Sequence, residues 1–312
     1  MLKSIGAAGL AALALVAAAP PKTAADNQSQ ADDIVVTGRR SGAPIWTVRS
    51  ETTTLVLVGS IRGVSKTTYW DPTALVEALR KADRVMFPQS AEFTASPFKA
   101  IGWIAKWNAM GSLPKGQSLA SIAAPDDMRR LAALAARKRV RPDYASRHPL
   151  HLSGDLRERA KGDIEFGRDA VDVVQRAIKQ YDLTKAPIRR GKAKPLVKEL
   201  FASTPQDHLP CLHAAIAMAE GGPAAVQARS DAWAARRVAE VVASPADGVY
   251  ETCWPAAAVL DSGAEMADQM KGLLAEPEVT VAVLSLHSLA EKGGVLDELA
   301  AAGFDIQGPA WK

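Results

Sequence analysis

The sequence predicts an α/β or α+β fold, in which terminal strand elements form one central sheet and a large helical insertion lies between them. Apolar strands are expected at Thr54–Val58 and Val279–Leu286, near opposite ends of the 312-residue chain. Most residues between them form Ala-rich or amphipathic segments with helical spacing. Strands at the two ends must pair with each other to be buried, so the helices between them are predicted to form an insertion.

The individual elements follow from local signals. Ser50–Thr53 separates two strands as a hairpin turn, and Asp71 and Pro72 suit the N-cap and first position of a helix. The expected strands are Ile45–Val48, Thr54–Val58, Arg84–Phe87, Val279–Leu286 and Phe304–Gln307, with Pro195–Leu200 as either a short strand or a helical turn. The expected helices are Thr73–Ala82, Pro97–Ala109, Asp126–Lys138, Phe166–Tyr181, Asp207–Glu220, Pro223–Val242, Glu251–Leu274 and Val295–Ala302.

The first 25 residues have the pattern of a secretory signal peptide. Lys3 supplies the positive charge, Ile5–Ala19 is apolar, and Thr23–Ala25 offers small residues for cleavage before Asp26. The apolar run is shorter than the ~20 residues of a membrane-spanning helix, which argues against an uncleaved anchor. We therefore expect an exported, periplasmic protein with a signal peptide (1–25), a flexible leader (26–43) and a single domain (44–312), which touches a membrane only through the signal peptide.

One segment of the leader suggests a protein partner. Asp32–Arg40 resembles the short segment at the mature start of some TonB-dependent outer-membrane receptors. This suggests an envelope protein partner as one hypothesis, with a disordered leader as the simpler interpretation.

Composition argues against a nucleic-acid partner. The formal charge is only +4, and basic residues are interspersed with acidic ones. Aromatic residues make up 5% of the chain, too few to suggest a stacking platform.

The two cysteines, Cys211 and Cys253, favour a disulfide in an oxidising compartment. Such a bridge would contribute roughly 3–4 kcal/mol on the chain-entropy account. The alternatives are two buried thiols, or a metal cluster of His208, Cys211 and His213, which is less favoured because zinc ligands usually come in separated pairs.

Two similar strand ends are the main functional signal. The first strand leads into Ser60-Ile61-Arg62 and the last into Ser285-Leu286-His287, and each is followed by a helix. Ligands of open α/β sheets bind beyond the carboxyl ends of the strands, so both ends are expected at one crevice.

Several short motifs occur in a characteristic order: Ile45-Trp46, Gly59-Ser60-Ile61-Arg62, Ala82-Asp83, Leu113 to Leu119, Leu284-Ser285-Leu286-His287 and Gly303-Phe304. From Pro44 to Gln307 this order resembles the TraB/GumN family, also called Tiki-like. That family has a Trp-containing hairpin, two Gly-x-x-His strand ends, an Ala-Asp helix end and a Leu-Pro-x-Gly-x-x-Leu turn.

The resemblance implies a metal-dependent hydrolase of peptidase type. Two His and nearby carboxylates would hold a divalent ion such as Mn, Co or Zn, which lowers the pKa of a bound water. A carboxylate could then act as general base. Asp169, in a Gly-x-Asp motif, together with Glu199 and Glu92, are the candidate acids here.

The sequence departs from the family pattern at these positions. Arg62 stands where the first His is expected; its guanidinium offers no lone pair and would repel a cation. Pro88 replaces an expected carboxylate, and Leu284 replaces the second Gly. We therefore expect a catalytically degenerate relative without a metal cofactor. Arg62 and His287, helped by the hydroxyls of Ser60 and Ser285, would bind a peptide or a small anionic ligand.

Simpler interpretations of these residues remain open. Arg62 could pair with a rim acid, His287 could bond to backbone, and both serines could satisfy backbone groups. An active metal-dependent hydrolase that uses His287 with recruited acids is the alternative function. The sequence has no Gly-x-Ser-x-Gly elbow and no phosphate-binding loop. His148 and His151 could form a metal pair, but a solvated turn is favoured.

Overall fold

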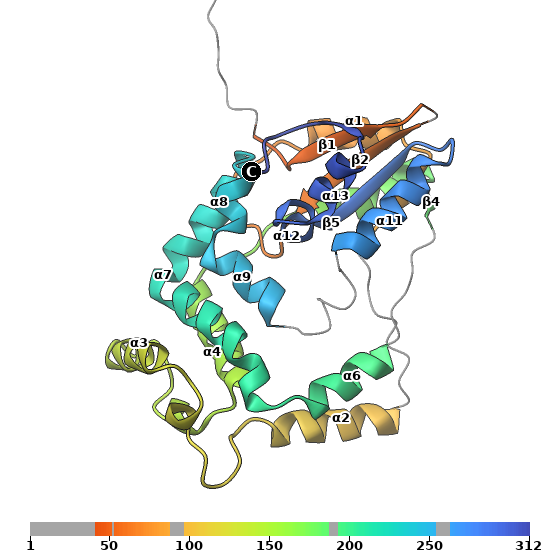
Figure 1. Ribbon diagram of the computed structural model, residues 1–312. Coiled ribbons are helices and arrows are strands. Elements are labelled where there is room, and N and C mark those ends of the chain that lie inside the picture. Colours follow the sequence, from red (N-terminus) through yellow and green to blue (C-terminus); the bar gives the residue numbers. More distant parts are fainter. Residues whose placement is uncertain (1–40, 52, 88–96, 187–192, 254–262) are drawn as a thin grey trace, which may run out of the picture. The chain divides into compact units, whose positions relative to one another are not determined.

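The computed structural model describes residues 41–51, 53–87, 97–186, 193–253 and 263–312 (Figure 1). Within them, six strands form one mixed sheet in the order β4-β3-β5-β2-β1-β6. The strands are β1 (Ile45–Arg49), β2 (Thr54–Ser60), β3 (Arg84–Met86), β4 (Thr184–Lys185), β5 (Thr280–Ser285) and β6 (Asp305–Gln307). The expected α/β class, with a sheet built from terminal strands around a helical insertion, is confirmed.

The centre of the sheet joins the two ends of the described chain. β2 and β5 are parallel neighbours, in register from Leu55 opposite Thr280 to Ser60 opposite Ser285. β3 and β4 extend the parallel part, whereas β1 pairs antiparallel with both β2 and β6. Both central strands are almost entirely buried, as is usual for strands covered on two faces.

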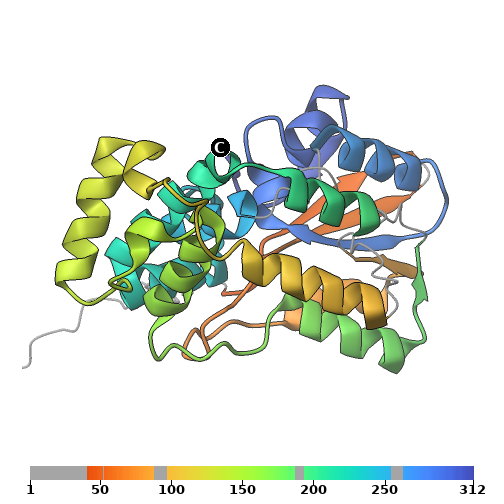
Figure 2. The ribbon, with the colours of Figure 1, turned by 90° about the horizontal axis from the view of Figure 1, so that it is seen from below.

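Helices cover both faces of the sheet (Figures 1 and 2). One face carries α1 and α5, which pack on each other, and the other carries α11, α12 and α13. These helices are α1 (Thr73–Arg80), α5 (Ala170–Tyr181), α11 (Gly263–Leu274), α12 (Leu286–Ala290) and α13 (Val295–Ala301).

A second apolar core lies where α7 packs against α3, α4 and α9. The remaining helices are α2 (Pro97–Ala109), α3 (Pro125–Ala136), α4 (Pro149–Lys161), α6 (Ala193–Ala202), α7 (Leu209–Ala234), α8 (Val238–Val242) and α9 (Pro245–Thr252), with short 3₁₀ turns at Leu119–Ser121, Tyr144–Ser146 and Pro205–His208. None of the described helices is long and apolar enough to cross a membrane.

Gly59 allows β1, α7 and α12 to approach the end of β2 closely. A Cβ added to Gly59 would lie 2.6 Å from the Leu286 Cδ1 atom and 3.2 Å from the Trp46 ring. The Gly59 carbonyl accepts a 2.9 Å hydrogen bond from the Trp233 Nε1 group of α7. This glycine therefore sets how closely α7 and α12 approach the strand.

Several local expectations are corrected. Pro195–Leu200 is not a strand but part of α6, where half-buried Val197 and buried Leu200 lie three residues apart on one helical face. The N-cap of α1 is Pro72, although the Asp71 carboxylate still accepts from the Thr73 backbone N–H at 2.9 Å.

The division of the Ala-rich helices is confirmed in part. The expected break between Glu220 and Pro223 lies inside α7, where Gly222 has a non-helical φ of 60°, whereas the expected continuation to Val242 is wrong because α8 is a separate helix. The expected helix Glu251–Leu274 corresponds to the end of α9 and to α11, with 254–262 outside the described residues. The two-residue strand β4 was not expected, because so short an element has no periodicity.

Candidate functional site

The carboxyl ends of β2 and β5 lie side by side, as the crevice argument requires. Ser60 and Ser285 are paired residues of the two strands. Ser60 is buried, and its Oγ donates a 2.9 Å hydrogen bond to the Leu284 carbonyl of the neighbouring strand. The Ser60 hydroxyl thus stabilises the strand pair, which matches the simpler interpretation of this residue.

Arg62 and His287 follow these two strand ends, the first in a loop and the second in a helix. Arg62 lies in the loop after β2, and its side chain is exposed. His287 does not extend a strand, because β5 ends at Ser285 and α12 begins at Leu286. The expected strand Val279–Leu286 was therefore one residue too long at each end, and His287 lies in the first turn of a short helix.

A buried ion pair connects the two positions. The Arg229 side chain, on α7, donates through Nη1 to the Arg62 carbonyl at 2.8 Å. Its Nε and Nη2 atoms lie 2.9 and 2.5 Å from the Asp247 Oδ1 atom, on α9. The other carboxylate oxygen of Asp247 lies 3.2 Å from the His287 Nδ1 atom. The pair thus links the backbone of one strand end to the side chain of the other.

Sequence reasoning did not find this pair. Arg229 and Asp247 each keep only 2% of their side chains exposed. The available signal was that Arg229 lies at helical spacing among the buried residues Val226, Ser230 and Trp233. A cation on the buried face of a helix requires a partner, and Asp247 provides it.

His287 lies between two carboxylates. Its Nδ1 atom contacts Asp247, and its Nε2 atom lies 3.3 Å from the Glu291 Oε2 atom, one helical turn later. The two acids thus sit at opposite nitrogens of the ring.

One divalent ion could lie between the His287 Nε2 and Glu291 Oε2 atoms, which are 3.3 Å apart. Asp247 already pairs with Arg229, so a metal at this place would need further ligands. Across the described ranges, no group of three or more His, Cys, Asp or Glu side chains could hold a metal ion.

The other candidate acids lie elsewhere or outside the described residues. Asp169 is the N-cap of α5, and its Oδ1 atom accepts from the Asp172 backbone N–H at 3.0 Å. Burial raises the pKa of Asp169. Glu199 is exposed on α6, and within the described part of the chain neither acid contacts His287. Glu92 lies outside the described residues.

A cavity of about 340 Å³ opens beside Arg62. Its wall combines apolar side chains from α2, α4 and α9 with a charged rim; the lining residues include Arg62, Trp107, Leu150, His151, Asp155, Arg157, Glu158, Val249 and Cys253. Asp155 pairs with Arg147 at 3.1 Å, and Arg157 lies 3.6 Å from Glu158. Arg62 forms no ion pair with any carboxylate in the described ranges.

The disulfide lies at this cavity. The sulfur atoms of Cys211 and Cys253 are 2.09 Å apart, which supports the expected bridge. Cys211 is therefore not available to a cluster with His208 and His213. The His208 Nε2 atom lies 2.7 Å from the Ser203 Oγ atom.

His148 and His151 are not in a solvated turn. His148 is buried at the N-cap of α4, where its Nδ1 atom accepts from the Leu150 backbone N–H at 3.3 Å. The His151 ring packs against Trp107 with centroids 4.2 Å apart. Burial, with smaller effects from His208 and His151, lowers the pKa of His148 to about 4.

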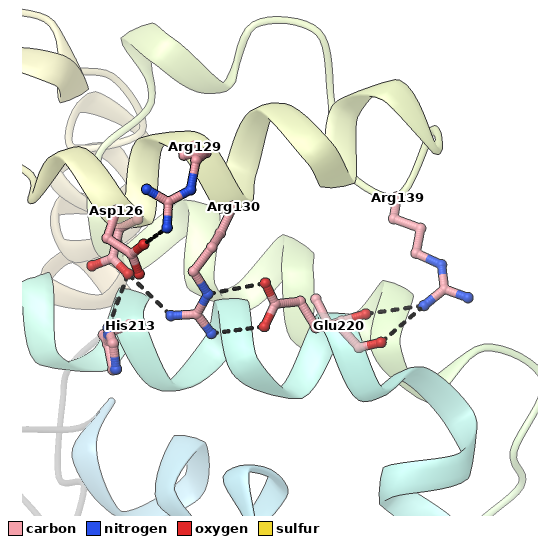
Figure 3. Close-up of polar contacts among 8 residues, drawn as sticks. Asp126, Arg129, Arg130, Arg139, His213 and Glu220 are labelled. Carbon is pink, nitrogen blue, oxygen red and sulfur yellow. Dashed lines mark hydrogen bonds and ion pairs between the residues drawn. The ribbon is translucent and has the colours of Figure 1, made fainter.

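His213 belongs to a polar contact between α3 and α7 (Figure 3). Its Nδ1 atom lies 2.9 Å from the Asp127 Oδ1 atom, which Arg130 also contacts at 3.2 Å. Arg130 makes a bidentate pair with Glu220, at 2.9 and 2.8 Å. These contacts join two helices away from the strand ends and give His213 a structural role.

These features define an α/β protein whose candidate site lies beyond the carboxyl ends of two central parallel strands. Residues 44–308 match the TraB/PrgY/gumN family, and the chain belongs to this family. No curated protein and no solved structure matches the chain.

Proposed function

We propose that this protein is an exported member of the family that has lost its metal centre and binds a peptide or small anionic ligand beside Arg62. One observation carries the proposal: a guanidinium that pairs with no carboxylate in the described ranges lines a cavity, at the position where the family resemblance expects a histidine. The backbone at this position is held by Arg229, so the loop that presents Arg62 is anchored.

The charges around the cavity favour an anion. The described acids on its wall already have basic neighbours, since Asp155 faces Arg147 and Glu158 faces Arg157. Arg62 then supplies the remaining positive charge, and a carboxylate could accept two parallel N–H bonds from it. The apolar wall next to Arg62, which includes Trp107 and Val249, suits the body of a peptide end.

Binding can be tested with acetylated tripeptides that differ only in a free or amidated C terminus. Isothermal titration is expected to give at least about tenfold tighter binding of the free acid, since charge-assisted bonds contribute about 1.5–3 kcal/mol. Arg62→Gln should abolish this difference. Arg157→Gln is the matched control, because it removes a cation that already lies near Glu158. Equal affinity for acid and amide, or no effect of Arg62→Gln, would refute anion binding at Arg62.

The alternative is an active metal-dependent hydrolase, which would require Mn, Co or Zn to displace the carboxylate contacts of His287. Metal analysis of the purified protein separates the two functions. We expect less than about 0.1 equivalent of any of these metals after dialysis. A stoichiometric metal that His287→Ala removes would overturn the degenerate assignment.

The cellular location is part of the proposal. Cell fractionation should place the protein in the periplasm, and mass measurement should give a mature chain that begins at Asp26. Deletion of residues 26–41 followed by a pulldown tests the envelope partner that the leader segment suggests. Retention in the cytoplasm with an intact N-terminus would refute export.

A further inference from the structure

Helix α2 has an apolar composition, but one of its faces is exposed. Its sequence, Pro-Phe-Lys-Ala-Ile-Gly-Trp-Ile-Ala-Lys-Trp-Asn-Ala, contains two Ile, two Trp and one Phe. None of the described side chains from 101 to 109 is buried. Ile101 and Ile104 are 64% and 59% exposed. Because they are three residues apart, they lie on the same face of the helix. An apolar helix in water is unfavourable, so this face requires a partner.

The opposite side of α2 is attached to the protein. Trp107 packs on His151 of α4, with ring centroids 4.2 Å apart, and Trp103 is half-buried. Lys106 lies over the Phe201 ring of α6, 5.7 Å from its centroid. The two helices lie side by side (Figures 1 and 2). These contacts fix the rotation of the helix, so that Ile101 and Ile104 point away from the protein.

The charges decide which partner fits. α2 has two lysines and no acidic residue, and α6 next to it has two lysines and one glutamate. A second copy of this chain would bring like charges together if the same face met itself. An anionic lipid surface would instead attract the lysines while it accepts the isoleucines.

We infer that α2 docks on the surface of an anionic membrane, with Ile101 and Ile104 inserted among the lipid chains. Thirteen residues of helix extend about 20 Å, too short for the ~30 Å hydrocarbon core, so the helix lies in the interface plane. This contact goes beyond the membrane role that the sequence analysis assigned to the signal peptide alone.

Vesicle flotation tests the inference with the purified full chain. Vesicles of equal parts phosphatidylglycerol and phosphatidylcholine are compared with vesicles of phosphatidylcholine alone. We expect binding to the anionic vesicles that falls at least fivefold in the double variant Ile101→Ser/Ile104→Ser. Lys106→Glu should weaken binding to anionic vesicles, and added salt should do the same.

Tyr69→Ser provides the matched control. Tyr69 is 80% exposed in the loop between β2 and α1, so its loss removes a large exposed hydrophobic side chain at another place. This variant should bind vesicles as the parent does. Circular dichroism of each variant checks that the fold is intact, which is expected because the altered side chains are exposed.

Two results would overturn the inference. One is an absence of flotation with anionic vesicles, or flotation that the double variant leaves unchanged. The other is a dimer in light scattering that the double variant dissociates without any vesicle binding, which would make a second copy the occupant.

Discussion

Replacing Asp247 by Asn is expected to destabilise the protein strongly. The change keeps the shape of the side chain but removes the charge that faces Arg229 and His287. Both members of the Arg229–Asp247 pair keep only 2% of their side chains exposed. Removing one partner of a buried ion pair costs about 3–5 kcal/mol, because it leaves an uncompensated charge in the interior. The Arg129–Asp126 pair, by contrast, is 77% and 54% exposed, and Asp126→Asn should cost about 0.2–1 kcal/mol.

Urea unfolding followed by Trp fluorescence measures the difference. With a slope near 3 kcal/mol/M, the midpoint of Asp247→Asn should fall by about 1–1.7 M, several times the shift of Asp126→Asn. The double variant Arg229→Met/Asp247→Leu should recover part of the loss, because neither charge is then left unpaired. Equal midpoints for Asp247→Asn and Asp126→Asn would refute the argument that this pair is buried and needed.

Three further predictions concern stability. Replacing Cys211 and Cys253 together by Ser should lower the free energy of unfolding by about 2–5 kcal/mol. Reduction of the parent protein should lower it by the same amount. An unchanged free energy of unfolding in urea titrations would contradict a disulfide in solution. The pKa of His148 is lowered to about 4 by burial, so the unfolded chain takes up the proton first as the pH falls. The free energy of unfolding should therefore decline from about pH 6.5 towards pH 4. His148→Asn keeps an acceptor for the helix N-terminus and should flatten this decline in thermal unfolding. If the variant shows the same pH slope, His148 is not the group responsible. Gly59→Ala should cost about 1–3 kcal/mol, because the added methyl would meet a leucine atom at 2.6 Å. Gly102→Ala lies in the interior of α2, where an added Cβ meets nothing within 4 Å, and should instead stabilise the protein by about 0.5–1 kcal/mol. If chemical denaturation shows that both substitutions stabilise, or that both destabilise, the crowding argument at Gly59 is refuted.

Much of the sheet was predictable because its strands carry strong local patterns. The runs at Thr54–Val58 and Val279–Leu286 are apolar, bounded by turn residues, and must be buried, so their pairing followed from position alone. β4 was missed because its two residues are both exposed and have no pattern. Pro195–Leu200 was ambiguous because six residues, four of them apolar, fit a strand and a helical turn equally well, and tertiary packing decided for α6.

The site was only partly predictable. The sequence placed Ser60 and Ser285 at matching strand ends, where the register pairs them. The sequence could not indicate that Arg229 and Asp247 would pair next to these strand ends, because the two residues lie on helices whose contact depends on the whole insertion. Helical spacing could mark Arg229 as buried, but no pattern in the sequence identifies Asp247 as its partner.

The pairing of β2 with β5 has a consequence for how the chain acquires its structure. The middle of the sheet requires a segment near residue 285, so the early hairpin has no partner for its inner edge until the last part of the chain is available. Such a long-range closure slows folding and leaves an apolar edge open to aggregation in the meantime. C-terminal truncation before residue 280 should accordingly abolish folding of the whole sheet.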